Sequence, residues 1–167
     1  MEYTGHYDSP LGGITLASDE ESLTGLWFDG QKYFADSLDR EHREKETPVL
    51  NQAKKWLDIY FSGKDPGFTP QLRMKTTDFR RAVWEIILTI PYGKTMTYRE
   101  IAEVIAEQKG IARMSAQAVG GAAGHNSISL IIPCHRVVGA DGKLTGYAGG
   151  LQIKRKLLEL ERVKYSG

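Results

Sequence analysis

The spacing of apolar residues changes character partway along the chain. In the first thirty residues, GGITLASD and SLTGLWFDG alternate or cluster β-branched and aromatic residues between turn residues, which is typical of β-strands. Beyond residue 76 the apolar positions recur at helical spacing instead. The pattern therefore predicts an α+β protein, with strands gathered in the N-terminal part and helices in the C-terminal part.

One helix is expected in the N-terminal part. The segment TPVLNQAKKWLDIYFSG begins with Thr47 and Pro48, residue types that favour a helix start. Its inward face is predicted to hold Leu50, Ala53, Leu57 and Tyr60. The segment before it, FADSLDREHREKE, is so rich in charge that we expect a mobile connection without regular structure.

The best candidate for a linker is SGKDPGFTPQ, residues 62–71, because glycine and proline interrupt both helices and strands. We therefore predict an N-terminal α/β domain over residues 1–70. The second domain would span residues 71–167.

Four helices are predicted in the second domain. The first carries one apolar stripe and ends at PYGK; the stripe consists of Phe79, Val83, Ile86, Ile87 and Ile90. Thr97 and Glu100 form a capping box that opens the second helix. Ser115 can cap a short third helix over 116–123, so that the second and third helices together resemble a helix-turn-helix. The last helix, near 151–162, is expected to turn Ile153, Leu157 and Leu160 inward.

The short helix AQAVGGAAG allows two interpretations. A helix that reads base edges needs long polar side chains, and only Gln117 is of that kind. Its small residues suit close approach to DNA of any sequence, through phosphates and groove shape. They equally suit a tightly packed core helix, and the residues alone leave both interpretations open.

Composition narrows the class of protein. Apolar residues make up 41% and charged residues 26% of the 167 residues, as in ordinary globular proteins. The net charge of +1 hides an asymmetry, because residues 1–75 hold 9 Lys and Arg against 13 Asp and Glu, whereas residues 76–167 hold 13 against 8. Only the second half suits a polyanion, although chance scatter of surface charge explains the asymmetry equally well.

A single cysteine forms no internal disulfide, so we expect a reducing compartment, the cytoplasm. No signal peptide and no membrane span are predicted, because the first residues lack the basic and apolar regions and no apolar run is long enough.

The only cysteine lies in LIIPCHRVVG, beside a histidine and an arginine. A nearby imidazole or guanidinium favours the reactive thiolate. Because neighbours on a strand point to opposite faces, contact between Cys134 and His135 requires a turn, which Pro133 could promote, or a bridging water. The histidine would also need an acidic partner. A lone cysteine is otherwise a small, inert, buried hydrophobe.

The motif IPCHRV resembles the active-site signature of the methylated-DNA–protein-cysteine methyltransferases, which repair O6-alkylguanine. FRRAVWEIILTIPYGKTMTYREIA and SAQAVGGAAGHN resemble the family's helix-turn-helix and asparagine hinge, and GYAGGLQIKRKLLELE its substrate loop and last helix. YDSPLGGITLASDEESLTGLWF resembles the bacterial N-terminal domain. The resemblance implies a small RNase H-like α/β domain followed by a winged-helix-like helical domain with a helix-turn-helix.

The resemblance also implies roles for single residues. Cys134 would accept the alkyl group, His135 would act as its base through a water, Glu161 would hold the histidine, and Tyr98 would protonate or hydrogen-bond the guanine. Substrate and DNA contacts or support would come from Ala116, Gln117, Gly120, Asn126, Arg136, Val137, Tyr147, Ala148 and Gly149.

Three positions depart from the best-known members of the family. Gln117 replaces an arginine that fills the gap left by the flipped base, Ala148 replaces a serine that bonds the guanine oxygen, and Ser127 replaces the proline after the hinge Asn126. Some members bind a structural zinc through cysteines, which a chain with one cysteine does not support.

The implied reaction is an irreversible, single-turnover transfer from O6-alkylguanine to Cys134, since a thioether has no easy route back to a thiol. It needs no cofactor and no metal. The expected partner is double-stranded DNA, bound through the minor groove by a monomer with little sequence preference and no membrane association. Two alternatives are a non-catalytic damage sensor, which commonly lacks the cysteine, and a thiol hydrolase, which would turn over repeatedly.

Overall fold

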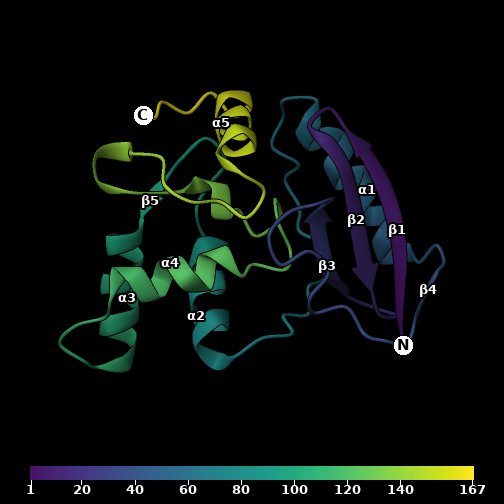
Figure 1. The fold of residues 1–167 in the computed structure, drawn as a ribbon, viewed down its shortest axis with the longest axis horizontal. Coiled ribbons are helices and arrows are strands. Elements are labelled where there is room, and N and C mark those ends of the chain that lie inside the picture. Colours follow the sequence, from purple (N-terminus) through teal and green to yellow (C-terminus); the bar gives the residue numbers. More distant parts are fainter. The chain divides into compact units, whose positions relative to one another are not determined.

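The computed structural model describes residues 1–167, which form two compact units (Figure 1). The first unit comprises Met1–Lys75 and Ser127–Ile131, and the second comprises Thr76–Asn126 and Ile132–Gly167. The first unit thus continues past the predicted linker and takes in a short segment from the second half of the chain. That residues 1–70 and 71–167 are separate domains stays a prediction.

The first unit is built on a four-stranded sheet in the order β3-β2-β1-β4. Its strands are β1 (Glu2–Ser9), β2 (Gly12–Ser18), β3 (Leu23–Phe28) and β4 (His42–Glu44). The first three pair antiparallel as consecutive hairpins, and β4 pairs parallel to β1. Helix α1 (Pro48–Phe61) contacts β1, β2 and β3, and its buried residues include the four predicted ones. Thr47 caps α1 by accepting a hydrogen bond from the Leu50 N–H, as expected for this residue type.

The prediction that the charged segment before α1 lacks regular structure is wrong at β4. All three residues of β4 are exposed, so no buried face imposes an alternation of apolar and polar side chains. The strand lies at the sheet edge, where charged side chains are common because they discourage pairing with another chain.

The other edge of the sheet, at β3, is covered by two segments from later in the chain. The Leu23 N–H donates to Gln71 O at 2.8 Å and the Arg73 N–H donates to Leu23 O at 2.9 Å. Further along β3, the Leu26 N–H donates to Ser127 O at 2.8 Å, and the Ser129 N–H donates to Leu26 O at 2.9 Å. Backbone groups that an open edge would leave unpaired are therefore satisfied.

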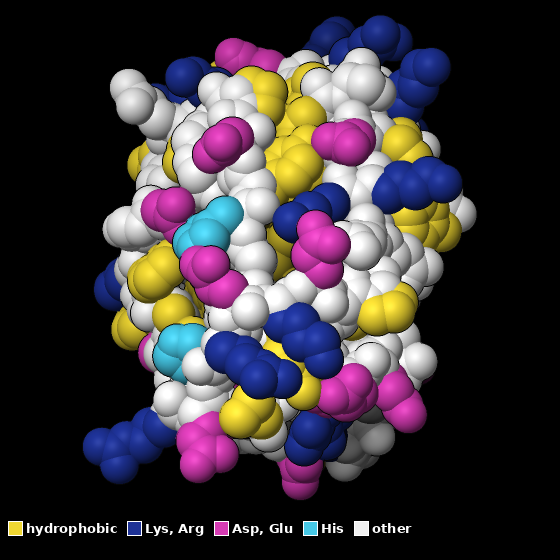
Figure 2. Space-filling view, turned by 90° about the vertical axis from the view of Figure 1, so that its right-hand side faces the viewer, with side chains coloured by type: hydrophobic (Ala, Val, Ile, Leu, Met, Phe, Trp, Pro, Cys, Tyr) yellow, Lys and Arg dark blue, Asp and Glu magenta, His cyan; other side chains and the backbone are white.

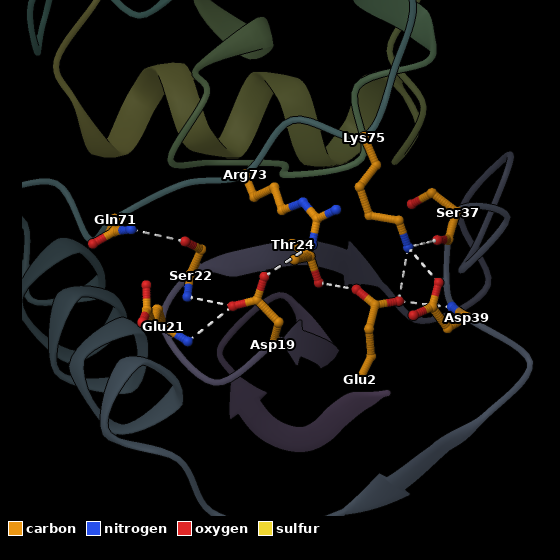
Figure 3. A network of polar contacts seen from close by, with 10 residues as sticks. All are labelled: Glu2, Asp19, Glu21, Ser22, Thr24, Ser37, Asp39, Gln71, Arg73 and Lys75. Atoms are coloured by element: carbon orange, nitrogen blue, oxygen red, sulfur yellow. Dashed lines mark hydrogen bonds and ion pairs between the residues drawn. The ribbon is translucent and has the colours of Figure 1, made fainter.

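A buried carboxylate organises one end of this unit (Figure 3). Glu2 accepts hydrogen bonds from the Thr24 hydroxyl, the Asp39 N–H and Lys75 Nζ, the last at 2.9 Å. Lys75 also forms an ion pair with Asp39 at 2.9 Å, and Arg73 forms one with Asp19 at 3.3 Å. These contacts fasten the end of the first unit, residues 71–75, to its sheet.

The face of the molecule in Figure 2 mixes the two signs of charge. Lysine and arginine side chains there alternate with aspartate and glutamate, around a narrow apolar strip. A surface of this kind lacks the single-sign field that attracts a polyanion.

The second unit is mainly helical. It contains α2 (Asp78–Ile87), β5 (Met96–Thr97), α3 (Tyr98–Lys109), α4 (Ala116–Gly124), the 3₁₀ helix η1 (Cys134–Arg136), β6 (Val137–Val138), the 3₁₀ helix η2 (Ala140–Gly142) and α5 (Leu151–Leu160). Helices α2, α3 and α4 contact one another, and β5 pairs parallel to β6. The predicted α+β class is confirmed. No helix in the structure has both the length and the apolar character that crossing a membrane requires.

The starts of α3 and α4 follow their predicted caps. The Thr97 hydroxyl accepts from the Glu100 N–H at 3.0 Å while Glu100 Oε1 accepts from the Thr97 N–H at 2.9 Å, which confirms the capping box. Ser115 caps α4 by accepting from the Ala118 N–H. Gly110 ends α3 with φ +65°, a conformation that glycine adopts without strain.

The inward face of α5 differs from the prediction. Leu157 is buried as expected, but Ile153 and Leu160 are only half-buried. Leu158 and Lys154 are fully buried in their place. Lys154 was not among the residues predicted to face inward, although it stands three residues before Leu157 and therefore on the same side of the helix.

Candidate active site

The cysteine lies in a turn rather than in a strand. Residues 134–136 form η1, and Pro133 precedes it with φ −81° and ψ 65°. The Cys134 N–H donates to Ile132 O at 2.8 Å, and the Arg136 N–H donates to Pro133 O at 2.9 Å. Because the backbone turns here, Cys134 and His135 are not forced to opposite faces as they would be in a strand.

Glu161 joins the two basic side chains of this turn. The residue caps the C-terminus of α5, where Oε2 contacts His135 Nε2 at 2.6 Å and Oε1 accepts from Arg136 Nε at 2.8 Å. Oε1 also accepts from the Gly93 N–H at 3.0 Å. Arg136 makes a further bond to Ile90 O at 2.8 Å. All three charged or titratable side chains are buried, so each depends on the others for its hydrogen bonds.

This arrangement holds the glutamate ionised and the histidine neutral. Burial acts to raise the pKa of Glu161, but the hydrogen bonds of His135 and Arg136 and the charge of Arg136 hold it at about 2. Burial lowers the pKa of His135, and the Glu161 contact opposes that effect without cancelling it. A neutral imidazole whose Nε2 faces a carboxylate can accept a proton, and the carboxylate then stabilises the imidazolium.

The thiol itself is held in its protonated form. Cys134 is 6% exposed, and burial raises its pKa to about 12. A hydrogen bond from Asn126 and the charge of Lys154 act in the opposite direction. The thiol therefore needs a base to become nucleophilic.

Asn126 ties the end of α4 to the segment that precedes the cysteine. Its Nδ2 donates to Ile132 O at 2.8 Å, and the Ile132 carbonyl also accepts from the Cys134 N–H. A shift of α4 would thus be transmitted to the cysteine turn.

Lys154 is a cation that the sequence interpretation did not place in the site. Its Nζ donates to Val137 O at 2.7 Å and to Gly146 O at 3.3 Å, and it lies 5.9 Å from the centre of the Tyr98 ring. Burial lowers its pKa to about 8, against the attraction of Cys134. The one indication in the sequence that this lysine faces inward is its spacing of three residues from Leu157, which puts both on the same face of α5.

Tyr98 and the loop before α5 lie beside this polar cluster. Tyr98 is the first residue of α3 and is half-buried, and burial raises its pKa. The Tyr147 ring meets the His135 ring edge-on, with centroids 6.5 Å apart. Val137 is fully buried in β6, whereas Ala148 and Gly149 are half-buried in the loop.

The α4 residues predicted to meet DNA form a separate surface. Ala116 and Gln117 are exposed at the start of α4, and Gly120 is half-buried one turn later. A Cβ added to Gly120 would lie 3.8 Å from the Tyr98 ring, so this glycine packs beside the tyrosine. The structure thus gathers the cysteine turn, Glu161, Asn126 and Tyr98 in one place and leaves the start of α4 on the surface.

Known proteins are similar to this chain in sequence and in fold. The DNA-binding domain of 6-O-methylguanine DNA methyltransferase matches residues 78–163, and the ribonuclease-like domain of the same family matches residues 3–74. The chain belongs to the 6-O-methylguanine DNA methyltransferase family.

Individual relatives cover almost the whole chain. The methylated-DNA–protein-cysteine methyltransferase of Mycobacterium tuberculosis is 46% identical over 94% of this chain and 92% of its own length. That of Haemophilus influenzae is 39% identical over 98% of this chain and 88% of its own. The crystal structure of M. tuberculosis OGT in complex with DNA has a TM-score of 0.79 at 45% identity, covering 96% of this chain and 92% of that one.

Proposed function

We propose that this protein repairs DNA by transferring the alkyl group of O6-alkylguanine irreversibly to Cys134, once per molecule. Family membership over both domains supports the reaction class. The observation that carries the assignment to particular atoms is the buried hydrogen bond between His135 and Glu161, next in sequence to the free thiol.

In this proposal His135 takes the thiol proton through a bridging water, and Glu161 stabilises the imidazolium that results. Arg136 keeps the glutamate ionised and fixes its position. The thiolate sulfur then attacks the alkyl carbon, the carbon–oxygen bond breaks, and its electron pair passes to guanine. The thioether product has no leaving group as good as guanine, so each molecule acts once.

Tyr98 supplies a proton or a hydrogen bond to the departing guanine. Val137, Tyr147, Ala148 and Gly149 line or shape the pocket for the extruded base, since a target atom inside a duplex is reached only after the nucleotide leaves the stack. Asn126 keeps the cysteine turn in register with α4. No step draws on a cofactor or a metal.

The DNA-binding surface is proposed to be α4, entering the minor groove. Its small residues, Ala116 and Gly120 among them, permit close backbone approach, and Gln117 stands where a side chain would fill the vacated stack. Contacts of this kind carry little sequence preference. We place the protein in the cytoplasm as a monomer, with the first unit in a supporting role.

Mass spectrometry after mixing the protein with a duplex that contains O6-methylguanine tests the proposal. We expect a gain of one methyl group on Cys134, with product formation stopping at one methyl per protein. Cys134→Ser should bind the duplex with similar affinity and gain no methyl, because a serine hydroxyl is a far weaker nucleophile toward carbon.

The alternatives give different results in the same experiment. Binding without methyl gain would indicate a damage sensor. Continued product release beyond one equivalent would indicate a hydrolase. Methyl transfer at the original rate by Cys134→Ser would overturn the assignment of the nucleophile.

A further inference from the structure

The hydroxyl of Tyr98 has a partner in the loop before α5. Thr145 Oγ1 donates a hydrogen bond to Tyr98 Oη at 3.0 Å. Both side chains are half-buried, so water competes for this bond less than it would at a fully exposed site.

Thr145 is held in place on both sides. Lys143 O accepts from the Gly139 N–H at 2.7 Å, and Gly146 O accepts from Lys154 Nζ at 3.3 Å. A Cβ on Gly139 would come within 3.2 Å of Thr145 Cγ2, so the threonine methyl packs against bare backbone. Since a β-branched side chain has few χ1 states, a packed methyl fixes the direction of the hydroxyl.

The direction of this hydrogen bond matters for proton transfer. A phenol has one proton, and because Thr145 donates to the phenol oxygen, that proton remains available for another acceptor. Donation to the oxygen also favours the phenolate that forms when the proton leaves. Burial raises the pKa of Tyr98 and a neighbouring Cys134 thiolate raises it further, whereas the Thr145 bond lowers it. The charged or titratable groups that face the ring are Lys154 and Cys134.

We propose that Thr145 is a positioning residue for the reaction, which aims the Tyr98 hydroxyl at the departing guanine and stabilises the phenolate. This inference rests on the proposed methyl transfer. As sulfur bonds to the methyl carbon, the carbon–oxygen electron pair enters the purine, and the purine takes the proton of Tyr98. The proton that His135 took from the thiol balances the charge, and solvent exchange returns the phenolate to phenol.

Two reactions of the same thiol separate this role from a structural one. Methyl transfer from O6-methylguanine needs a proton for its leaving group, whereas alkylation by iodoacetamide releases iodide, which needs none. Thr145→Val removes the hydroxyl and keeps the shape, Thr145→Ser keeps the hydroxyl, and Tyr98→Phe removes the proton donor. Thr15→Val is the matched control, because the Thr15 hydroxyl, on β2 of the first unit, bonds Asp29 in the turn after β3.

We expect Thr145→Val to slow single-turnover methyl transfer about 3- to 10-fold, the range for losing one neutral hydrogen bond. The iodoacetamide rate should not change. Thr145→Ser should stay within about 2-fold of the original rate, and Thr15→Val should match it. In the Tyr98→Phe background, which should itself be slower by at least about 10-fold, adding Thr145→Val should cost nothing more.

Several outcomes would overturn the proposal. Unchanged transfer by Thr145→Val, an equal cost in the Tyr98→Phe background, or a parallel loss of iodoacetamide reactivity would each do so. Full activity of Tyr98→Phe would remove the proton donor and the role of Thr145 with it, while leaving methyl transfer intact. If Thr145→Val does not fold, Thr145→Ala is compared with Thr145→Ser in the same way. Absence of transfer by the original protein would instead refute the proposed function.

Discussion

Glu161 is the residue on which both basic side chains of the cysteine turn depend. One of its oxygens contacts His135, and the other accepts from Arg136 and from the Gly93 N–H. A buried carboxylate with three such partners stays ionised, while burial of the imidazole keeps the histidine neutral and able to take a proton. In the proposed reaction, the same atoms would serve both stability and reactivity.

Glu161→Gln should slow methyl transfer without abolishing it. The amide keeps the size of the side chain but not the charge that stabilises the imidazolium, so the pKa of the Cys134 thiol should rise further. The remaining thiolate is more nucleophilic, which offsets part of the loss, because the Brønsted slope for thiols is about 0.4–0.5. Breaking the buried pair with Arg136 should also lower the free energy of unfolding by about 3–5 kcal/mol.

Single-turnover transfer, iodoacetamide alkylation against pH, and urea unfolding measure these effects. Glu159→Gln is the matched control, since Glu159 is exposed on the same helix. A variant Glu161→Gln with unchanged thiol titration, transfer rate and stability would remove the carboxylate from the site.

Lys154 makes the stability of the protein depend on pH above neutrality. Its pKa is about 8 in the folded protein, below the ordinary lysine value, because burial disfavours the ammonium. The folded state therefore releases this proton before the unfolded state does, so stability rises as pH increases from 8 toward the unfolded value. The pKa of the Cys134 thiol is raised instead, so the stability that the thiol contributes is lost as pH rises toward 12. This loss of stability masks the gain from Lys154.

Removing the thiol isolates the lysine. In a Cys134→Ser background, unfolding by urea should show a gain of up to about 3 kcal/mol between pH 8 and about 10.4. The gain should vanish in Cys134→Ser/Lys154→Met and persist in Cys134→Ser/Lys156→Met, which alters an exposed lysine of α5. A flat profile in the first variant would contradict a buried, proton-releasing Lys154.

Among the helices and strands, the sequence predicted those features that contacts between residues close in the chain determine. The capping box at Thr97 and the cap at Ser115 gave the starts of α3 and α4, because these side chains bond to the backbone within the same turn. Strand β4 was missed because its pairing to β1 is a distant contact and none of its side chains is buried. The contacts of Lys154 were missed because its partners, two backbone carbonyls, carry no signal in the sequence, although its spacing from Leu157 placed it on the inner face of α5.

The site shows the same division. The motif around Cys134 predicted the types of the reacting groups, and spacing along η1 and α5 could not tell which of them touch. Strand geometry alone implied that contact between Cys134 and His135 needs either a turn, which Pro133 could promote, or a bridging water, and η1 is such a turn. The bond from Thr145 to Tyr98 depends on how a loop folds, so no local pattern predicts it.

The proposed DNA-binding role of helix α4 can be tested at Gln117. Gln117 is exposed at the second position of α4, where an added cation would not disturb the core. Gln117→Arg should tighten binding to duplex DNA and speed repair, and the slope of log K against log salt should steepen by about 0.9 for one more neutralised phosphate. Binding isotherms at several salt concentrations measure the slope. Gln52→Arg adds the same charge on α1 of the first unit and should leave it unchanged. Equal slopes for both variants would indicate that Gln117 does not meet DNA.

Across the whole molecule, the chain leaves the second unit at Asn126 and returns to it at Ile132. The residues between them belong to the first unit, where Ile128 and Leu130 are fully buried. If the first unit unfolded alone, this segment would become an exposed apolar loop between Asn126 and Ile132 of the second unit. The hydrogen bond between these two residues would close the ends of that loop. Since exposing buried apolar side chains is costly, the two units should unfold together.

Ile128→Ala tests this cooperation. Truncating a fully buried isoleucine lowers the free energy of unfolding by about 2–5 kcal/mol. If the two units unfold in one transition, the protection of their amides from hydrogen exchange should fall by the same free energy in both. Hydrogen exchange measured by mass spectrometry can follow β2 for the first unit and α2 for the second. Ile111→Ala, at an exposed position, should change neither. Loss of protection in β2 with α2 unaffected would show that the units unfold separately, and would favour the division into independent domains at residue 70.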